Sequence, residues 1–233
     1  MTLWTPLAIA DGFVEGGVSL AGVAFMAGSG LLHVGYYSSL QRGYEHGDLS
    51  VVYPLARGAG PALSVTGAIL FLGERPSTLG LAGGGLIVAG VLSLAAGRGA
   101  GIGAALATGA FIAAYTVWDA HAVGPLNQPP IVYFCGAEAI RTLLLAPFVH
   151  DVRPTWERNR RAILGVGILS PLAYVLVLFA LTRAPISLVA PVRESSVVLG
   201  ALLGAKVLEE GQIAKRIVAA TAIALGIAAL ALS

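Results

Sequence analysis

Two apolar segments of the same design occupy corresponding places in the two halves of the chain. The first runs from Ser50 to Glu74 and the second from Ser187 to Glu210. Pro191 follows Pro54 by 137 residues. The same shift aligns Gly30 with Gly167, Leu32 with Leu169, Tyr37 with Tyr174, Ser50 with Ser187, and Val52 with Val189. Paired, proline-interrupted apolar segments are typical of transporters built from repeats, so we expect helices broken at both prolines with a binding site nearby.

The composition places these segments in a membrane. Hydrophobic residues make up 57% of the 233 residues and charged residues only 11%, with a mean hydropathy of +0.84. Soluble domains contain about 25% charged residues. A net charge of +2 without a basic stripe argues against a nucleic-acid partner. The single cysteine, Cys135, excludes an internal disulfide and a cysteine-based metal site.

A bilayer-spanning helix needs about 20 mostly apolar residues, and lipid requires that every backbone polar group be bonded internally. On this basis the sequence predicts an all-α, polytopic membrane protein. The polar stretch from His150 to Arg161 is expected to be a surface loop. The expected spans are 19–41, 50–73, 78–97, 101–122, 130–150, 162–182, 187–208 and 213–232.

The spans are divided unequally between the two expected repeats. Residues 1–98 hold three spans and residues 99–233 hold five. The shift of 137 residues places Met1 opposite Glu138, in the middle of the fifth span. The first repeat is therefore expected to lack one helix and much of a second. A start codon assigned too late is favoured over a natural shortened form.

Orientation follows from the lysine and arginine residues in the loops. Arg75 and Arg183 lie on one side of the expected membrane. Eight basic residues lie on the other side: Arg42, Arg98, Arg153, Arg158, Arg160, Arg161, Lys215 and Arg216. This bias predicts that the eight-residue side is cytoplasmic and that both termini lie outside.

Both halves resemble a known family. The first half contains VYPLARGAGP, FLGE and GLIVAGVLSL, and the second contains SLVAPVRESSVVLGALLG, VLEE and AIALGIAALAL. From about Gly28 to Ser233 the chain is similar to the EamA-type transporters of the drug/metabolite transporter superfamily. The resemblance implies two inverted five-helix repeats that move small metabolites by alternating access, with cytoplasmic termini. The chain departs from it in having eight of the ten helices, and the charge bias favours the opposite orientation.

Arg57 is the leading candidate for a binding residue. A guanidinium about seven residues into a span is costly unless it faces a cavity or a partner, and Tyr53, four residues earlier, shares its helix face. Arg57 would then bind an anion or act as a gate in a central cavity. The alternative is that its side chain snorkels to the interface.

Other polar residues in the spans leave two interpretations open. Arg193 and Glu194, with the hydroxyl of Ser195, either line a cavity or pair with another helix. Tyr36 and Tyr37, with His33, form a polar-aromatic face suited equally to cavity lining and to helix packing. The complete set of predicted substrate-binding residues is Tyr36, Tyr37, Tyr53, Arg57, Trp118, Arg193, Glu194 and Ser195.

Two further groups share helix faces. Glu138 and Arg141, three residues apart, are expected to neutralise each other. Tyr115, Trp118 and Asp119 fall on one face near a helix end, where Asp119 is expected to be an interfacial carboxylate rather than a proton carrier.

The sequence thus favours a secondary-active exporter or permease for a small polar or amphiphilic metabolite. The alternatives are a non-transporting truncated or accessory membrane subunit and an integral-membrane lipid-modifying enzyme. No serine elbow, paired-histidine metal motif or phosphate loop is present in the sequence, so no enzyme activity, cofactor or metal is expected. The expected surroundings are the lipid bilayer of the cell membrane (an inner membrane) and a small-molecule substrate, and a homodimer is compatible with the sequence.

Overall fold

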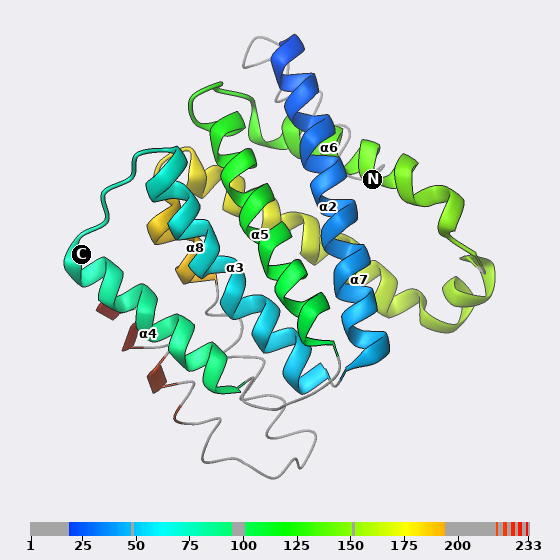
Figure 1. Cartoon of the computed structure of the whole chain (residues 1–233). Coiled ribbons are helices and arrows are strands. Elements are labelled where there is room, and N and C mark those ends of the chain that lie inside the picture. Colours follow the sequence, from blue (N-terminus) through cyan, green and yellow to red (C-terminus); the bar gives the residue numbers. More distant parts are fainter. Residues whose placement is uncertain are drawn as a thin grey trace. The chain divides into compact units, whose positions relative to one another are not determined.

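Helices make up the part of the chain that the computed structural model describes (Figure 1). The described residues are 19–47, 49–94, 101–150 and 152–193, together with 218, 221, 222, 225, 226, 228, 229 and 232. Within these ranges no strand occurs. The helices are α2 (Leu20–His46), α3 (Leu49–Phe71), α4 (Thr78–Leu94), α5 (Ile102–Val123), α6 (Pro130–Leu145), the 3₁₀ helix η1 (Ala146–Phe148), α7 (Val152–Leu181) and α8 (Ile186–Arg193).

Four of the described stretches are long and apolar enough to cross a bilayer. They are α2, α5, α6 continued by η1, and α7, and the apolar parts of α3 and α4 are shorter. The first six expected spans each coincide with one of the helices α2 to α7, which confirms the all-α membrane class. The seventh expected span begins as α8, and the rest of it and most of the eighth lie outside the described residues.

The expected surface loop between His150 and Arg161 is wrong. Helix α7 begins at Val152, so the stretch is helical on both sides of a kink at Asn159 (φ −123°, ψ 19°). The Nε of Arg153 donates to Oε1 of Glu157 over 3.0 Å, an exposed contact one helical turn apart. Polarity correctly indicated exposure here, but it does not distinguish an exposed helix from a loop.

The expectation of a helix broken at the matched proline is also wrong for Pro54, whereas for Pro191 it stays a prediction, because the described part of α8 ends at Arg193. Pro54 is the sixth residue of α3, which continues past it to Phe71, and Pro191 is the sixth of α8. A proline at this position removes only the bond to the carbonyl of the helix's second residue, Ser50 in α3 and Ser187 in α8. The remaining bonds of α3 hold it together.

Contacts divide the chain into two units. The first unit comprises Met1–Val34 and Trp118–Arg183, and the second comprises Gly35–Val117 and Ala184–Ser233. The division of the chain into repeats at residue 98 is a separate matter and stays a prediction.

In the second unit, α3 packs against both α4 and α8, and α4 also contacts α8. The helices that carry the two matched prolines therefore lie against each other. Close approach of α3 to α5 depends on glycine: a Cβ at Gly60 would lie 2.6 Å from Cγ2 of Ile112. A small buried cluster of Val52, Ala56 and Ala105 completes this packing.

Candidate functional site

Aromatic rings and guanidinium groups gather in the second unit. The Tyr36 ring makes edge contacts with the rings of Tyr37 and Tyr115, with centroid distances of 4.8 and 5.9 Å. These residues come from α2 and α5, two helices that are far apart along the chain. We call the complete group the tyrosine–arginine cluster: Tyr36, Tyr37, Tyr44, Tyr53, Arg57, Tyr115 and Arg193.

Each arginine of the cluster lies over a tyrosine ring. Cζ of Arg57 is 5.4 Å from the ring centroid of Tyr53, and Cζ of Arg193 is 5.9 Å from that of Tyr115. Both distances fall within the range of cation–π contacts. The first contact joins residues four apart on α3, as the sequence predicted, whereas the second joins α8 to α5.

Helix α2 contributes two tyrosines that lie near Arg57. Arg57 interacts electrostatically with the side chains of Tyr36 and Tyr44. A guanidinium presents a planar fork of donors that matches a carboxylate or a phosphate. Two such groups, each lying over an aromatic ring, can bind an anionic group and can also contact an aromatic one.

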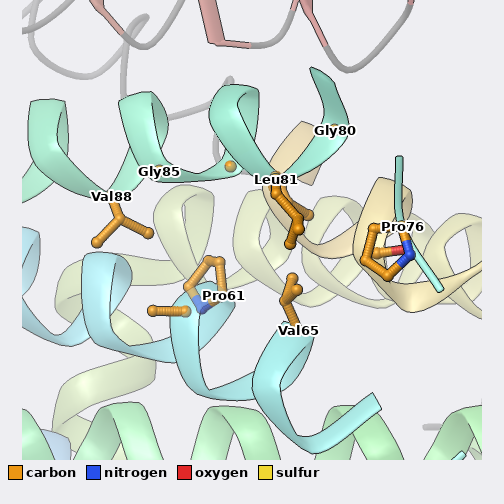
Figure 2. A pocket seen from close by; sticks show the side chains of 11 residues that line it. Pro61, Val65, Pro76, Gly80, Leu81, Gly85 and Val88 are labelled. Carbon is orange, nitrogen blue, oxygen red and sulfur yellow. The ribbon is translucent and has the colours of Figure 1, made fainter. Parts of the chain in front are cut away.

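An apolar cavity of ≈ 240 Å³ lies beside the cluster's helices, between α3, α4 and α8 (Figure 2). Pro61 and Val65 of α3 face Leu81 and Val88 of α4 across it. Pro61 is one helical turn after Arg57, so α3 carries the arginine and the cavity wall on adjacent turns. The described lining residues are Pro61, Ala62, Val65, Pro76, Gly80, Leu81, Gly84, Gly85, Val88, Ser187 and Pro191.

Glu74 fixes the start of α8. Its Oε1 accepts the backbone N–H of Ile186 at 2.7 Å, and its Oε2 accepts that of Ser187 at 3.0 Å. The first N–H groups of a helix have no partner inside it, and the positive end of the helix dipole favours a carboxylate. The preceding Gly73 has φ +68°, which turns the chain sharply after α3. The sequence placed this glutamate in the FLGE motif but did not indicate its partner.

In the first unit, a carboxylate from α5 accepts bonds from two tyrosines. The hydroxyl of Tyr133 donates to Oδ1 of Asp119 over 2.7 Å, and that of Tyr174 donates to Oδ2 over 2.5 Å. Asp119 is 0% exposed. The expectation of an interfacial carboxylate is therefore wrong: the residue is near the end of α5, but its side chain is turned into the interior.

The remaining candidate residues are dispersed. Trp118 belongs to the first unit, where it stacks on Phe25 at 4.4 Å and donates from Nε1 to the Phe25 carbonyl. Glu194 and Ser195 lie outside the described residues. The structure thus groups Tyr36, Tyr37, Tyr53, Arg57 and Arg193, and adds Tyr44 and Tyr115, which the sequence had not included in the site.

The predicted pairing of Glu138 with Arg141 is confirmed. Their side chains form an ion pair within α6. No three histidine, cysteine, aspartate or glutamate residues come together as a metal site within the described ranges.

Three comparisons with known proteins bear on this arrangement. No curated protein sequence matches the chain. A solved crystal structure, described only as that of a protein, is similar with a TM-score of 0.71 and 22% identity, over 99% of this chain and 84% of the other. That likeness supports the fold alone. The profile of the EamA-like transporter family matches residues 99–232, the range predicted for the second repeat and more than half of the sequence. The chain belongs to the EamA-like transporter family.

Proposed function

We propose that the chain is a secondary-active transporter that moves a small amphiphilic metabolite with an anionic group across the cell membrane by alternating access. The observation that carries the proposal is the placing of Arg57 and Arg193 over tyrosine rings, on two helices that pack together and that carry the two matched prolines of the predicted repeats. In inverted-repeat transporters the site lies where such helices meet near the bilayer midplane.

The chemistry of the cluster supports an anionic substrate. A guanidinium within a span is stabilised by water, a partner or a ligand, and its planar fork matches carboxylate and phosphate oxygens. The adjoining cavity is lined almost entirely by apolar described residues, and its wall begins one turn from Arg57. The anionic group would bind at Arg57 while an apolar portion occupies this cavity.

The sequence also bears on the energy source for transport. No phosphate-binding loop is present in the sequence, so ATP hydrolysis by this chain is not expected. Movement would instead be driven by the gradient of the substrate or of a coupled ion.

A resistance screen tests the proposal. Cells that overproduce the chain would be challenged with matched sets of toxic anionic, neutral and cationic metabolite analogues, and uptake or efflux of each responsive compound would then be measured in proteoliposomes. We expect the responsive compounds to be anionic and apolar in part. The matched control is Arg75→Lys, because Arg75 is an exposed arginine between α3 and α4. Loss of transport in Arg57→Lys but not in Arg75→Lys would show that the cluster binds the transported compound. A chain that moves none of the compounds in proteoliposomes would contradict the proposal and favour an accessory subunit.

A further inference from the structure

The first unit contains a second group of titratable side chains, which the proposed anion site does not use. Its centre is Asp119 on α5, which is buried and bonded to two tyrosine hydroxyls. The side chains of Ser29 and His33, one turn apart on α2, also interact with this carboxylate. The group therefore draws on four helices, α2, α5, α6 and α7.

We infer that Asp119 is a proton-binding site, which takes up a proton from the aqueous phase on one side of the membrane and releases it to the other during transport. This inference rests on the proposed function, because it names the coupled ion. A single proton moves, and no other reactant is required.

The partners of Asp119 suit both of its protonation states. A tyrosine hydroxyl donates to an ionised carboxylate and can equally accept a bond from a protonated one. The groups that face Asp119 are the hydroxyls of Tyr133 and Tyr174, Ser29, and His33. Among the described residues no lysine or arginine bonds to this carboxylate, and such a cation would hold it ionised.

His33 is placed to share the proton. Its Nδ1 lies 2.9 Å from the carbonyl oxygen of Ser29, which can only accept, so Nδ1 carries a hydrogen. Nε2 is then the nitrogen that gains or loses a proton. The ring also meets the ring of Tyr174 edge-on at 5.4 Å. A proton on Asp119 with neutral His33 has the same net charge as ionised Asp119 with His33 protonated, so exchange between them leaves the net charge of the group unchanged.

Protonation of Asp119 would alter contacts between helices. The ionised carboxylate accepts one bond from α6, through Tyr133, and one from α7, through Tyr174. When one oxygen becomes an O–H donor, the tyrosine that donated to it must rotate its hydroxyl to accept or give up the bond. Proton occupancy is thereby linked to how α5 is tied to α6 and α7, which is the link that coupled transport needs.

Infrared difference spectroscopy on the purified whole chain tests the site without any substrate. We expect a carboxylic-acid C=O band that appears as the pH falls, is absent in Asp119→Asn, and persists in Glu138→Gln, the matched variant at the ion-paired carboxylate of α6. Tyr174→Phe, which removes a donor to the ionised form, should move the midpoint of this band to higher pH, and His33→Gln should move it in the same direction. If Asp119→Asn does not fold, the shift in Tyr174→Phe still identifies the band.

A band that never titrates while the protein stays folded, or one unaffected by Asp119→Asn, would overturn the inference and leave Asp119 as a static tie between helices. A second measurement separates this result from failure of the proposed function. For an anionic compound found in the screen, an imposed pH gradient should accelerate transport by the unmodified chain and not by Asp119→Asn. A titrating band with no compound transported would contradict the proposed function alone.

Discussion

The two units surround their ionisable side chains by different means. In the second unit, guanidinium groups lie over tyrosine rings, whereas in the first unit a carboxylate accepts bonds from tyrosine hydroxyls. A guanidinium stays charged at every relevant pH, and the face of an aromatic ring attracts it without neutralising it. A carboxylate can be neutralised by one proton, and a hydroxyl accommodates either state. The second unit is therefore suited to hold a permanent binding charge, and the first to hold a charge that changes.

The largest effect is expected from Arg57→Lys. Lysine keeps the charge but loses the planar fork, so transport of an anionic compound should fall at least about tenfold, the equivalent of one charge-assisted hydrogen bond. Arg193→Lys, one residue before the position in α8 that matches Arg57, should lower transport in the same way. Transport per molecule of inserted protein is the measurement. Unchanged transport in Arg57→Lys would show that this arginine only snorkels to the interface, and the contrast between the units would then lose its functional meaning.

Removing the carboxylate from each of two ion pairs should cost more stability where the pair is less exposed to solvent. The side chains of Arg141 and Glu138 are only 20% and 16% exposed, and those of Arg153 and Glu157 are 90% and 63% exposed. Glu138→Ala leaves a mostly buried guanidinium without its carboxylate and should lower the free energy of unfolding by about 3 kcal/mol. Glu157→Ala should change it by less than about 0.5 kcal/mol.

Chemical unfolding in detergent would measure both variants. Equal losses in Glu138→Ala and Glu157→Ala would mean that the α6 pair is as well solvated as the surface pair of α7.

Glu74→Ala should have an intermediate effect. It removes the acceptor of two backbone N–H groups at the start of α8, and the loss of a helix cap costs about 1–2 kcal/mol. Because α8 also holds Arg193 near Tyr115, we expect weaker transport alongside lower stability. Glu157→Ala again serves as the exposed control. Unfolding curves identical to those of the unmodified chain would show that α8 does not need this cap.

Contacts within one helix were predictable from sequence. The spacing of Glu138 and Arg141 and that of Tyr53 and Arg57 place each pair on one face, because helix geometry alone decides it. The first residues of most helices were also predicted to within a residue or so, because they coincide with the beginnings of the apolar runs.

Contacts between helices were not predictable. The bonds from Ile186 and Ser187 to Glu74, and from Tyr174 to Asp119, join residues far apart in the sequence. Glu74 lies after α3 and outside any helix, and the sequence of α5 has no apolar stripe that would indicate which of its faces meets α7. Proline was misleading for a related reason: it indicates a missing bond, and the rest of the helix decides whether that bond matters.

Tyrosine-to-phenylalanine substitutions compare the two units most directly, because they remove one hydroxyl and keep the ring. In the first unit, Tyr133→Phe deletes a 2.7 Å bond to a buried carboxylate and should lower the free energy of unfolding by about 1–2 kcal/mol near neutral pH. In the second unit, Tyr53→Phe keeps the ring under Arg57 and should change it by less than about 0.5 kcal/mol, since phenylalanine also supports a cation–π contact.

The two units should differ more clearly in how the stability cost of each substitution depends on pH. The Tyr133 hydroxyl favours the ionised form of Asp119, so the cost of Tyr133→Phe should diminish as the pH falls and the carboxylate becomes protonated. Tyr53 faces a group that does not titrate, so the small cost of Tyr53→Phe should be the same throughout. Unfolding of both variants in detergent, measured across the pH range in which the unmodified chain stays folded, is the test. A cost of Tyr133→Phe that does not vary with pH would mean that Asp119 keeps one protonation state, and the two units would then differ only in the sign of a fixed charge.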